Sequence, residues 1–162
     1  MGSAPPRTGD GWFTLFTLAW LAIWTVQLTP VQLLLPLQLN TPDDASGWIG
    51  GVVSSGVIMA IGGLVAIIAG PVSGALSDRT RSKWGRRRPW ALAGVWLMAL
   101  CLVALASATS VWAVALAWVG VSVGVAVASA AFTALIADQL REQRGAASAA
   151  VSSSQALGII VG

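Results

Sequence analysis

Most of the charge in this chain is concentrated in one short segment, SDRTRSKWGRRRPW, which runs from Ser77 to Trp90. Six of the nine basic residues fall inside these fourteen positions, together with the carboxylate of Asp78. A carboxylate close to several guanidinium groups forms ion pairs, and such pairs can hold two helix ends together. A single exposed pair contributes only about 0–1 kcal/mol, so a latch needs partial burial or several charges acting together. The segment is therefore a candidate conformational latch.

Three stripes of hydroxyl and amide side chains could supply hydrogen bonds from within apolar segments. The members of each stripe recur at helical spacing, such as i, i+4 and i+7, so they share one face of a helix. Such faces are typical of helices that enclose a wet cavity. The stripes are Thr25, Thr29 and Gln32; Ser122, Ser129 and Thr133; and Ser148, Ser152 and Gln155.

Two interpretations of these stripes remain open. In the first, the side chains line a cavity that holds a small polar solute. In the second, each serine or threonine bonds the i−4 carbonyl of its own helix and contacts nothing else. The amides of Gln32 and Gln155 are harder to explain in the second way, because an amide away from water must find partners.

The residue sets of common catalytic and metal sites are missing from the sequence. It contains no histidine and only one cysteine, Cys101, so a Cys/His zinc site or an intrachain disulfide is not expected. We recognise no nucleophile–base pair and no phosphate-cradling loop. We therefore expect no enzymatic activity, no metal and no cofactor.

The elements that position these residues must be membrane helices. Hydrophobic residues make up 56% of the 162 residues and charged residues only 9%, against about 25% charged residues in a soluble domain. A helix that spans a bilayer needs roughly 20 apolar residues, and the alternating segments of a β-barrel are absent. The expected fold class is all-α, a polytopic transmembrane helix bundle with four complete helices and a partial fifth.

Polar breaks divide the chain into a cytoplasmic tail, residues 1–11, and a transmembrane domain, residues 12–162. The last apolar run, ALGIIVG, has no polar ending. This indicates a fragment, which missing C-terminal helices or another membrane polypeptide would complete. The expected helices cover residues 12–39, 47–76, 90–106, 111–137 and 146–162.

The basic residues also predict the orientation of the helices. Lysine and arginine near membrane segments are retained on the cytoplasmic side. With the amino terminus inside, all nine basic residues lie in cytoplasmic segments, and the two opposite loops contain none. We therefore expect a multi-pass protein of the plasma membrane with a cytoplasmic N-terminus. Because topology explains the positive charge, no nucleic-acid partner is expected, and attraction of anionic lipid headgroups is a by-product.

The helix faces suggest how the bundle is arranged. The third segment, ALAGVWLMALCLVALA, offers no hydroxyl, amide or charge, so it is expected at the periphery, facing lipid. The fourth carries small residues opposite its polar stripe, which permits close helix contact. Tryptophans inside the helices are expected to face lipid or neighbouring helices, with stacking against a sugar as the alternative. The small residues are Gly120, Gly124 and Ala128, and the tryptophans are Trp20, Trp24, Trp96 and Trp118.

The segment GALSDR, residues 74–79, followed by GRRR, residues 85–88, resembles the signature loop of major facilitator superfamily transporters. Five residues, Thr80 to Trp84, separate the two parts, and a proline follows. This longer form resembles the sucrose-transporter and glycoside–pentoside–hexuronide branch. LTPVQ, residues 28–32, and the final segment RGAASAAVSSSQALGIIVG loosely resemble the first and fifth helices of that branch.

The resemblance implies a transporter that alternates between inward- and outward-facing states around a site between two six-helix halves. It implies that helices one, two, four and five face the cavity. It also assigns the charged segment to a latch, in which Gly74 allows close packing and Gly85 a tight turn. The residues expected in or near the latch are Gly74, Asp78, Arg79, Gly85, Arg86, Arg87, Arg88, Asp138 and Arg144.

Two features depart from the family pattern. Melibiose-type relatives bind their coupling cation with acidic residues inside helices two and four. The second helix here offers only hydroxyl groups, such as Ser54 and Ser55, which argues against that sodium mechanism. The chain is also too short for twelve helices.

The leading hypothesis is the N-terminal portion of a secondary active transporter for a sugar or another small polar solute, possibly with a coupling cation. The alternative is a non-transporting scaffold or accessory subunit.

Overall fold

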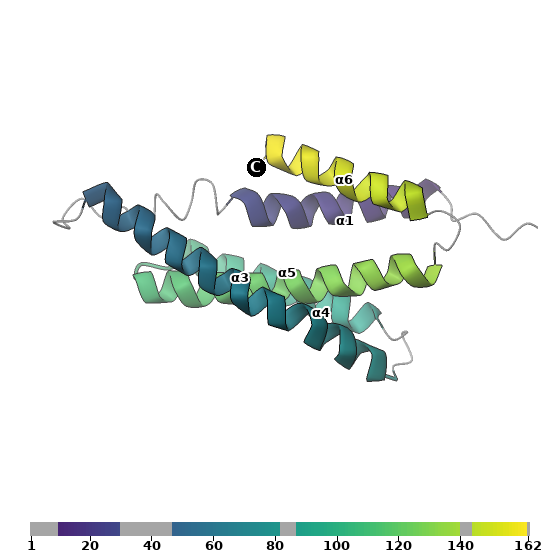
Figure 1. Ribbon diagram of the computed structural model, residues 1–162, viewed down its shortest axis with the longest axis horizontal. Coiled ribbons are helices and arrows are strands. Elements are labelled where there is room, and N and C mark those ends of the chain that lie inside the picture. The colour runs from purple at the N-terminus through teal and green to yellow at the C-terminus, as the bar shows by residue number, and fades with distance from the viewer. Residues whose placement is uncertain (1–9, 30–46, 82–86, 140–143, 162) are drawn as a thin grey trace, which may run out of the picture.

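A computed structural model describes residues 10–29, 47–81, 87–139 and 144–161 (Figure 1). All regular structure in these residues is helical, so the all-α fold class is confirmed. The helices are α1 (Asp10–Thr29), α3 (Gly47–Arg79), α4 (Arg88–Ala106), α5 (Val111–Gln139) and α6 (Arg144–Val161).

Three of the described helices are long and apolar enough to cross a membrane. The qualifying stretches are Gly50–Arg79, Arg88–Ala106 and Val111–Ala134. The apolar stretch of α1, Thr14–Leu28, is shorter. Several large apolar side chains on α3 and α4 are exposed, and Ile67 and Val103 reach 70%, as expected of surfaces that face lipid rather than water.

The helices form two layers of unequal tightness (Figure 1). In the first layer, α3 and α4 both pack against α5. In the second, α1 pairs with α6, and both touch α5 only lightly. Ile23 of α1 and Ile58 of α3 nevertheless join the same buried cluster as α5, so the layers meet around a shared core.

The contact between α4 and α5 brings one backbone against the other. A Cβ atom on Gly94 would lie 2.7 Å from the amide nitrogen of Ala128, and one on Gly124 would lie 2.7 Å from that of Met98. No side chain fits at either position without a shift of the backbone. Since lipid is as apolar as the helices, close van der Waals packing of this kind is what holds membrane helices together.

The pair formed by α1 and α6 is held by a different kind of contact. Ser154, which is completely buried, places its hydroxyl 3.2 Å from the carbonyl oxygen of Thr17 on α1 and 2.7 Å from that of Ala150 on its own helix. One turn further along, a Cβ atom on Gly158 would lie 2.7 Å from the Cβ of Trp24. A buried hydroxyl and a glycine thus fix the position of α6 on α1.

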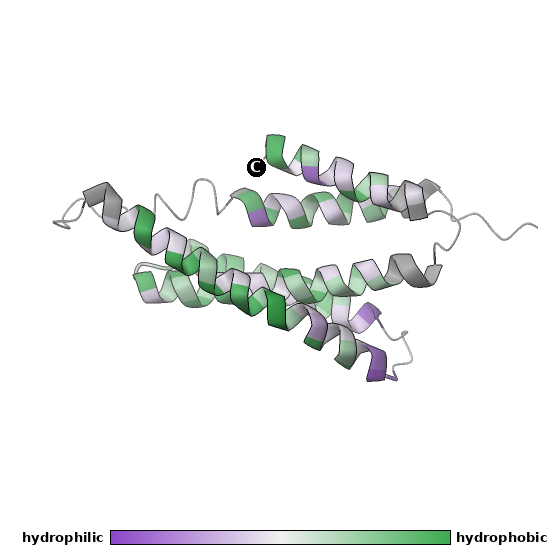
Figure 2. Ribbon diagram, viewed as in Figure 1, coloured by the Kyte–Doolittle hydropathy of each residue, from purple (hydrophilic) through white to green (hydrophobic). Residues whose placement is uncertain are grey.

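Charge is confined to one end of the bundle. Consecutive helices alternate in direction, so the start of α1, the α3–α4 connection and the α5–α6 connection lie at the same end (Figure 1). Every charged residue in the described part of the chain belongs to this end. Hydropathy colouring shows the hydrophilic residues of α3 and α4 gathered there, at the lower right, with the apolar parts of both helices extending to the left (Figure 2).

Candidate functional site

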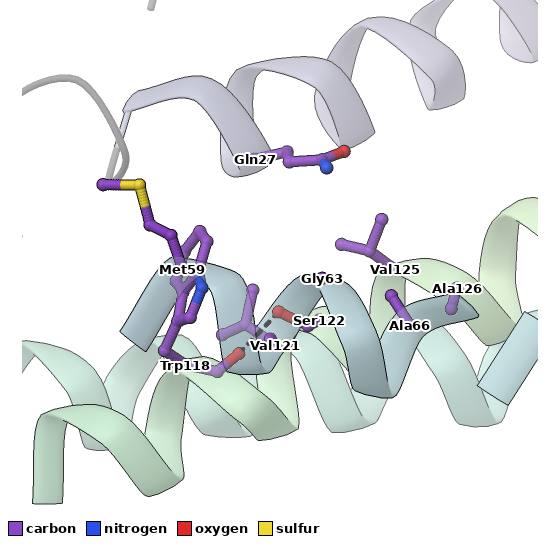
Figure 3. A pocket seen from close by; sticks show the side chains of 10 residues that line it. Gln27, Met59, Gly63, Ala66, Trp118, Val121, Ser122, Val125 and Ala126 are labelled. Atoms are coloured by element: carbon purple, nitrogen blue, oxygen red, sulfur yellow. Dashed lines mark hydrogen bonds between the residues drawn. The ribbon is translucent and has the colours of Figure 1, made fainter. Parts of the chain in front are cut away.

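A cavity of about 310 Å³ lies between the two layers. One residue of α1 faces it, while α3 and α5 form the rest of its wall (Figure 3). The wall is mostly apolar, and none of its residues is charged. Its lining consists of Gln27, Met59, Gly62, Gly63, Ala66, Trp118, Val121, Ser122, Val125 and Ala126.

Three side chains give the cavity its polar groups. The Ser122 hydroxyl donates to the carbonyl oxygen of Trp118 at 2.9 Å, which leaves its oxygen lone pairs as acceptors. The indole nitrogen of Trp118 donates to no acceptor among the described residues. Gln27, on the opposite wall, adds an amide that both donates and accepts (Figure 3). These groups can recognise a neutral polar molecule.

The shape of the cavity depends on a glycine in α3. A Cβ atom on Gly62 would lie 2.6 Å from Oγ of Ser122 and 2.8 Å from Nε1 of Trp118. The neighbouring Gly63 also lines the cavity, but a Cβ there meets nothing within 4 Å. Gly62 therefore leaves room for the two polar groups on α5, and Gly63 faces open space.

The predicted stripe on α5 begins at the cavity. Ser122 lines it, whereas Ser129 is half-buried and Thr133 exposed further along the helix. The opposite side of α5 packs against α4 through Gly124 and Ala128. The polar face of α5 thus meets the cavity, whereas its small-residue face meets the backbone of α4.

The predicted stripe on α1 does not reach this cavity within the described residues. Gln27, which lines the cavity, follows Thr25 by two positions. This step is a rotation of about 200° around the helix, so the two side chains leave α1 in nearly opposite directions. The side chain of Thr29 and all of Gln32 lie outside the described residues. The sequence pattern did not predict Gln27 as a lining residue, because the i, i+4, i+7 spacing selected the other face of the helix. The amide of Gln27, a polar group within an apolar segment, was the signal that could have identified it.

The stripe on α6 faces away from the cavity. Ser148, Ser152 and Gln155 are all exposed, while the buried Ser154 of the same helix contacts α1. Of the stripe residues whose side chains the structure describes, only Ser122 lines the cavity. That the other described members line a larger translocation path stays a prediction.

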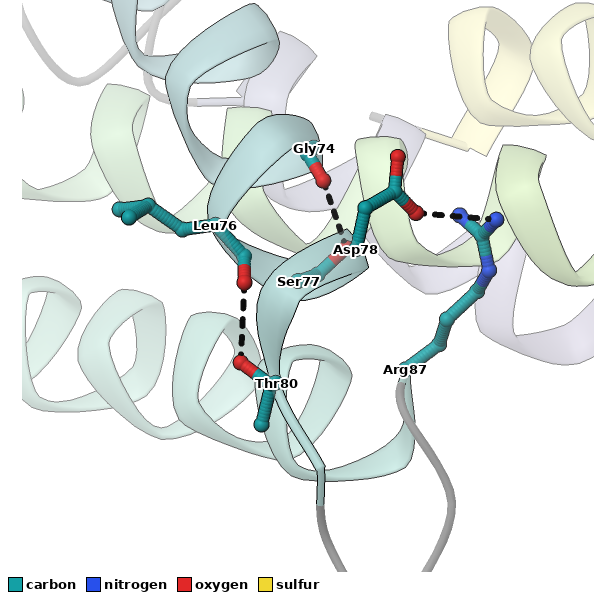
Figure 4. Close-up of polar contacts among 6 residues, drawn as sticks. All are labelled: Gly74, Leu76, Ser77, Asp78, Thr80 and Arg87. Atoms are coloured by element: carbon teal, nitrogen blue, oxygen red, sulfur yellow. Dashed lines mark hydrogen bonds and ion pairs between the residues drawn. The ribbon is translucent and has the colours of Figure 1, made fainter.

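At the charged end, Asp78 pairs with a residue across the α3–α4 connection (Figure 4). An oxygen of its carboxylate lies 3.3 Å from a guanidinium nitrogen of Arg87. Asp78 is in the last turn of α3 and Arg87 is the N-cap of α4, so each faces the unfavourable pole of its own helix dipole. The attraction between the two side chains offsets both unfavourable interactions with the helix dipoles. Since the side chain of Asp78 is 53% exposed, the pair is a weak one.

A second contact joins the same two helix ends. Thr80 donates its hydroxyl to the carbonyl of Leu76 at 2.9 Å and accepts a hydrogen bond from the indole nitrogen of Trp90, also at 2.9 Å. Its backbone N–H donates to the carbonyl oxygen of Ser77 at 3.2 Å, which ends α3. Pro89 lies in the first turn of α4, where the backbone N–H has no partner within the helix, so its absence costs no intrahelical hydrogen bond.

The remaining residues predicted for the latch are unevenly described. Arg79 and Arg88 are exposed, and a Cβ atom on Gly74 would meet nothing within 4 Å. Gly85 and Arg86, and the side chains of Asp138 and Arg144, lie outside the described residues. The structure thus brings together Asp78 and Arg87 from this set. Within the described residues, no three His, Cys, Asp or Glu side chains are grouped so as to hold a metal ion.

Comparison with known proteins agrees with the membrane architecture. A family model described as Major Facilitator Superfamily matches residues 3–162. A stretch of 41 residues is 51% identical to a protein of Synechocystis sp. (strain ATCC 27184 / PCC 6803 / Kazusa) that is named an uncharacterized symporter. This stretch is 25% of the chain but only 8% of the relative. No solved structure matches the chain. The chain is thus a multi-pass membrane protein that belongs to the Major Facilitator Superfamily, a family of transporters.

Proposed function

We propose that this chain forms part of a secondary active transporter that moves a small polar solute, a sugar in the first instance, by alternating access. The observation that carries the proposal is the uncharged cavity between the two layers. It offers an amide, a hydroxyl and an indole N–H within an otherwise apolar wall. Pockets of this composition bind small molecules whose orientation is fixed by a few polar contacts.

The absence of charge from the cavity lining supports a neutral solute. A charged solute in a membrane interior needs a partner of opposite charge, and none of the ten lining residues supplies one. Assignment to the sucrose-transporter and glycoside–pentoside–hexuronide branch is likewise a proposal. It is supported by the five-residue spacing of the charged segment.

The two layers provide a physical basis for alternating access. A rigid unit of α3, α4 and α5 and a lightly attached pair of α1 and α6 can move relative to each other at small cost. In our proposal Asp78 acts as a latch by exchanging Arg87, its partner within the α3–α4–α5 unit, for a neighbouring helix end as the layers move. A weak, half-exposed pair suits this role, because a strongly stabilised one would trap a single state.

A coupling cation is a further part of the proposal. The name of the Synechocystis relative, a symporter, supports it. Between Gly47 and Ser77, α3 contains no acidic residue, so a cation site would not use carboxylates from this helix. Hydroxyl and carbonyl oxygens are the remaining ligands there.

We propose a plasma-membrane location with the charged end of the bundle in the cytoplasm. Cysteine labelling tests this orientation in a background where Cys101 is replaced by alanine. Arg81→Cys and Thr109→Cys introduce exposed thiols at opposite ends of the bundle. We expect a membrane-impermeant maleimide added to intact cells to label position 109 only. Labelling of position 81 instead would reverse the orientation.

The transport function is tested by uptake into liposomes. The protein expressed from its own gene is reconstituted and offered radiolabelled sugars, polyols, amino acids and organic acids, with and without a sodium or proton gradient. We expect saturable uptake of an uncharged solute that an imposed gradient accelerates. If the folded protein moves no solute, the transport function is wrong and the scaffold or accessory-subunit alternative is favoured.

A further inference from the structure

Two buried donors on α1 have no role in the architecture described above. The indole nitrogens of Trp20 and Trp24 are shielded from solvent, and neither has a hydrogen-bond acceptor within the described residues. Trp20 is only 7% exposed. Buried donors are nearly always paired in native structures, and each exception needs an explanation. Two exceptions one turn apart on the same helix suggest a common cause.

The two tryptophans lie in line with the cavity. Trp20, Trp24 and Gln27 recur at i, i+4 and i+7 and therefore share one face of α1. Gln27 lines the cavity. At the other end of this row, the ring of Trp20 lies 6.5 Å from that of Phe132 on α5, with the two planes inclined by 51°. The donor row, as we name these three residues, thus extends from the cavity into the contact between the layers.

The chemistry of the donor row selects one class of solute. Each tryptophan offers a neutral N–H donor and no acceptor, and Gln27 adds an amide. Neutral donors satisfy the hydroxyl and ether oxygens of an uncharged molecule, whereas a carboxylate or ammonium group would remain without a counter-charge. On the basis of the proposed transport function, we propose that Trp20 and Trp24 are binding donors for the oxygens of a sugar or polyol.

The donors become accessible by a movement that the packing permits. In the arrangement described, Phe132 lies against the Trp20 ring, and the layers are otherwise lightly joined. The contacts of Ser154 with Thr17 and of Gly158 with Trp24 are within the α1–α6 pair. The α1–α6 pair can therefore move away from α5 without breaking the contacts of Ser154 and Gly158. The solute then takes the place of Phe132 beside the indole of Trp20.

A structural role for the same residues makes a different prediction. If an acceptor outside the described residues pairs with these N–H groups, their removal lowers stability and leaves solute affinity unchanged. If the groups bind solute, their removal weakens solute binding whatever its effect on stability. Solute affinity and melting temperature therefore have to be measured together.

The experiment compares Trp20→Phe and Trp24→Phe with the wild type. Both variants keep an aromatic ring and lose the donor. Trp96→Phe is the matched control. Trp96 is 66% exposed on α4, a helix that packs against α5, whereas the donor row lies on α1. The protein expressed from its own gene is reconstituted in liposomes, and uptake of sucrose, xylose and mannitol is measured, with glucuronate as a charged comparator. The melting temperature of each variant is recorded in detergent.

We expect the wild type to take up at least one uncharged probe in preference to glucuronate. Loss of one neutral hydrogen bond should raise KM about 2- to 10-fold in each variant, with little change in the maximal rate, and Trp96→Phe should behave as the wild type. If Trp20→Phe does not fold, Trp24→Phe still tests the proposal, because phenylalanine retains the Cβ that contacts Gly158.

Three results would overturn the proposal. Uptake with unchanged KM in the variants makes the tryptophans structural and leaves the transport function intact. Preferred uptake of glucuronate contradicts the solute class alone. Absence of uptake of every uncharged probe by the wild type contradicts the inference, and absence of uptake across the wider solute panel contradicts the transport function as well.

Discussion

The contact between α4 and α5 and the contact between the two layers are built on opposite principles. At the first, Gly94 and Gly124 bring backbone against backbone and leave no space. At the second, α1 and α5 are separated by aromatic rings, by two indole donors that have no acceptor among the described residues, and by a cavity of about 310 Å³. Dense backbone contact resists displacement, whereas a loosely filled contact has more than one arrangement of similar energy. This difference supports the proposal that α3, α4 and α5 form a scaffold and that the pair of α1 and α6 moves against it.

The largest effect is expected from a methyl group in the tight contact. Gly124→Ala places a Cβ 2.7 Å from the backbone nitrogen of Met98, and overpacking of this kind costs about 1–3 kcal/mol. We expect a clear fall in the melting temperature in detergent. Gly56→Ala is the control, because a Cβ there meets nothing within 4 Å. Equal melting temperatures for the two variants would contradict the conclusion that the α4–α5 contact is more tightly packed than the contact between the layers.

A methyl group at the edge of the cavity should act less on stability and more on transport. Gly62→Ala crowds Ser122 and Trp118, whose side chains can shift, so we expect a loss of about 1 kcal/mol and a raised KM for solute uptake. Gly56→Ala makes the same change on the same helix outside the cavity lining, where a Cβ meets nothing within 4 Å, and should leave KM unchanged. Similar KM values for both variants would show that the cavity does not hold the solute.

The attachment of α6 to α1 is tested by removing a buried hydroxyl. Ser154→Ala loses the interaction with the carbonyl of Thr17, and a typical hydrogen bond contributes about 0.5–1.5 kcal/mol. We expect a loss at the lower end of this range, because the hydroxyl also has an acceptor on its own helix. Ser152→Ala, at an exposed position of α6, should leave the melting temperature unchanged. An equal loss in both variants would contradict a specific α1–α6 contact.

The smallest effect on stability is expected at the charged end. Asp78→Asn removes the pair with Arg87, and an exposed ion pair contributes about 0–1 kcal/mol. We expect nearly unchanged stability and membrane insertion but slower uptake. Arg81→Gln, which removes an exposed charge from the same end of the bundle, should retain transport. Unchanged uptake by Asp78→Asn would contradict the latch.

Much of the fold was predictable because the bilayer restricts the possible structures. An apolar chain in lipid must satisfy its backbone internally, so long apolar runs become helices. Small residues also predicted one face of α5, since Gly124 and Ala128 contact α4. The site was less predictable. Spacing identified helix faces but could not tell which face meets a neighbour, and for α1 it selected Thr25 rather than Gln27.

The sequence by itself determined that this protein is an all-α membrane bundle with its basic residues at one end, because hydrophobicity and charge act on each segment independently of the others. Only the tertiary structure decided that Asp78 pairs with Arg87, that Gln27 and Ser122 share a cavity, and that two indole donors on α1 lie buried with no acceptor in the described part of the chain. These features depend on the rotation of each helix about its axis. That rotation is set by side-chain packing between segments far apart in the chain, which no local pattern contains.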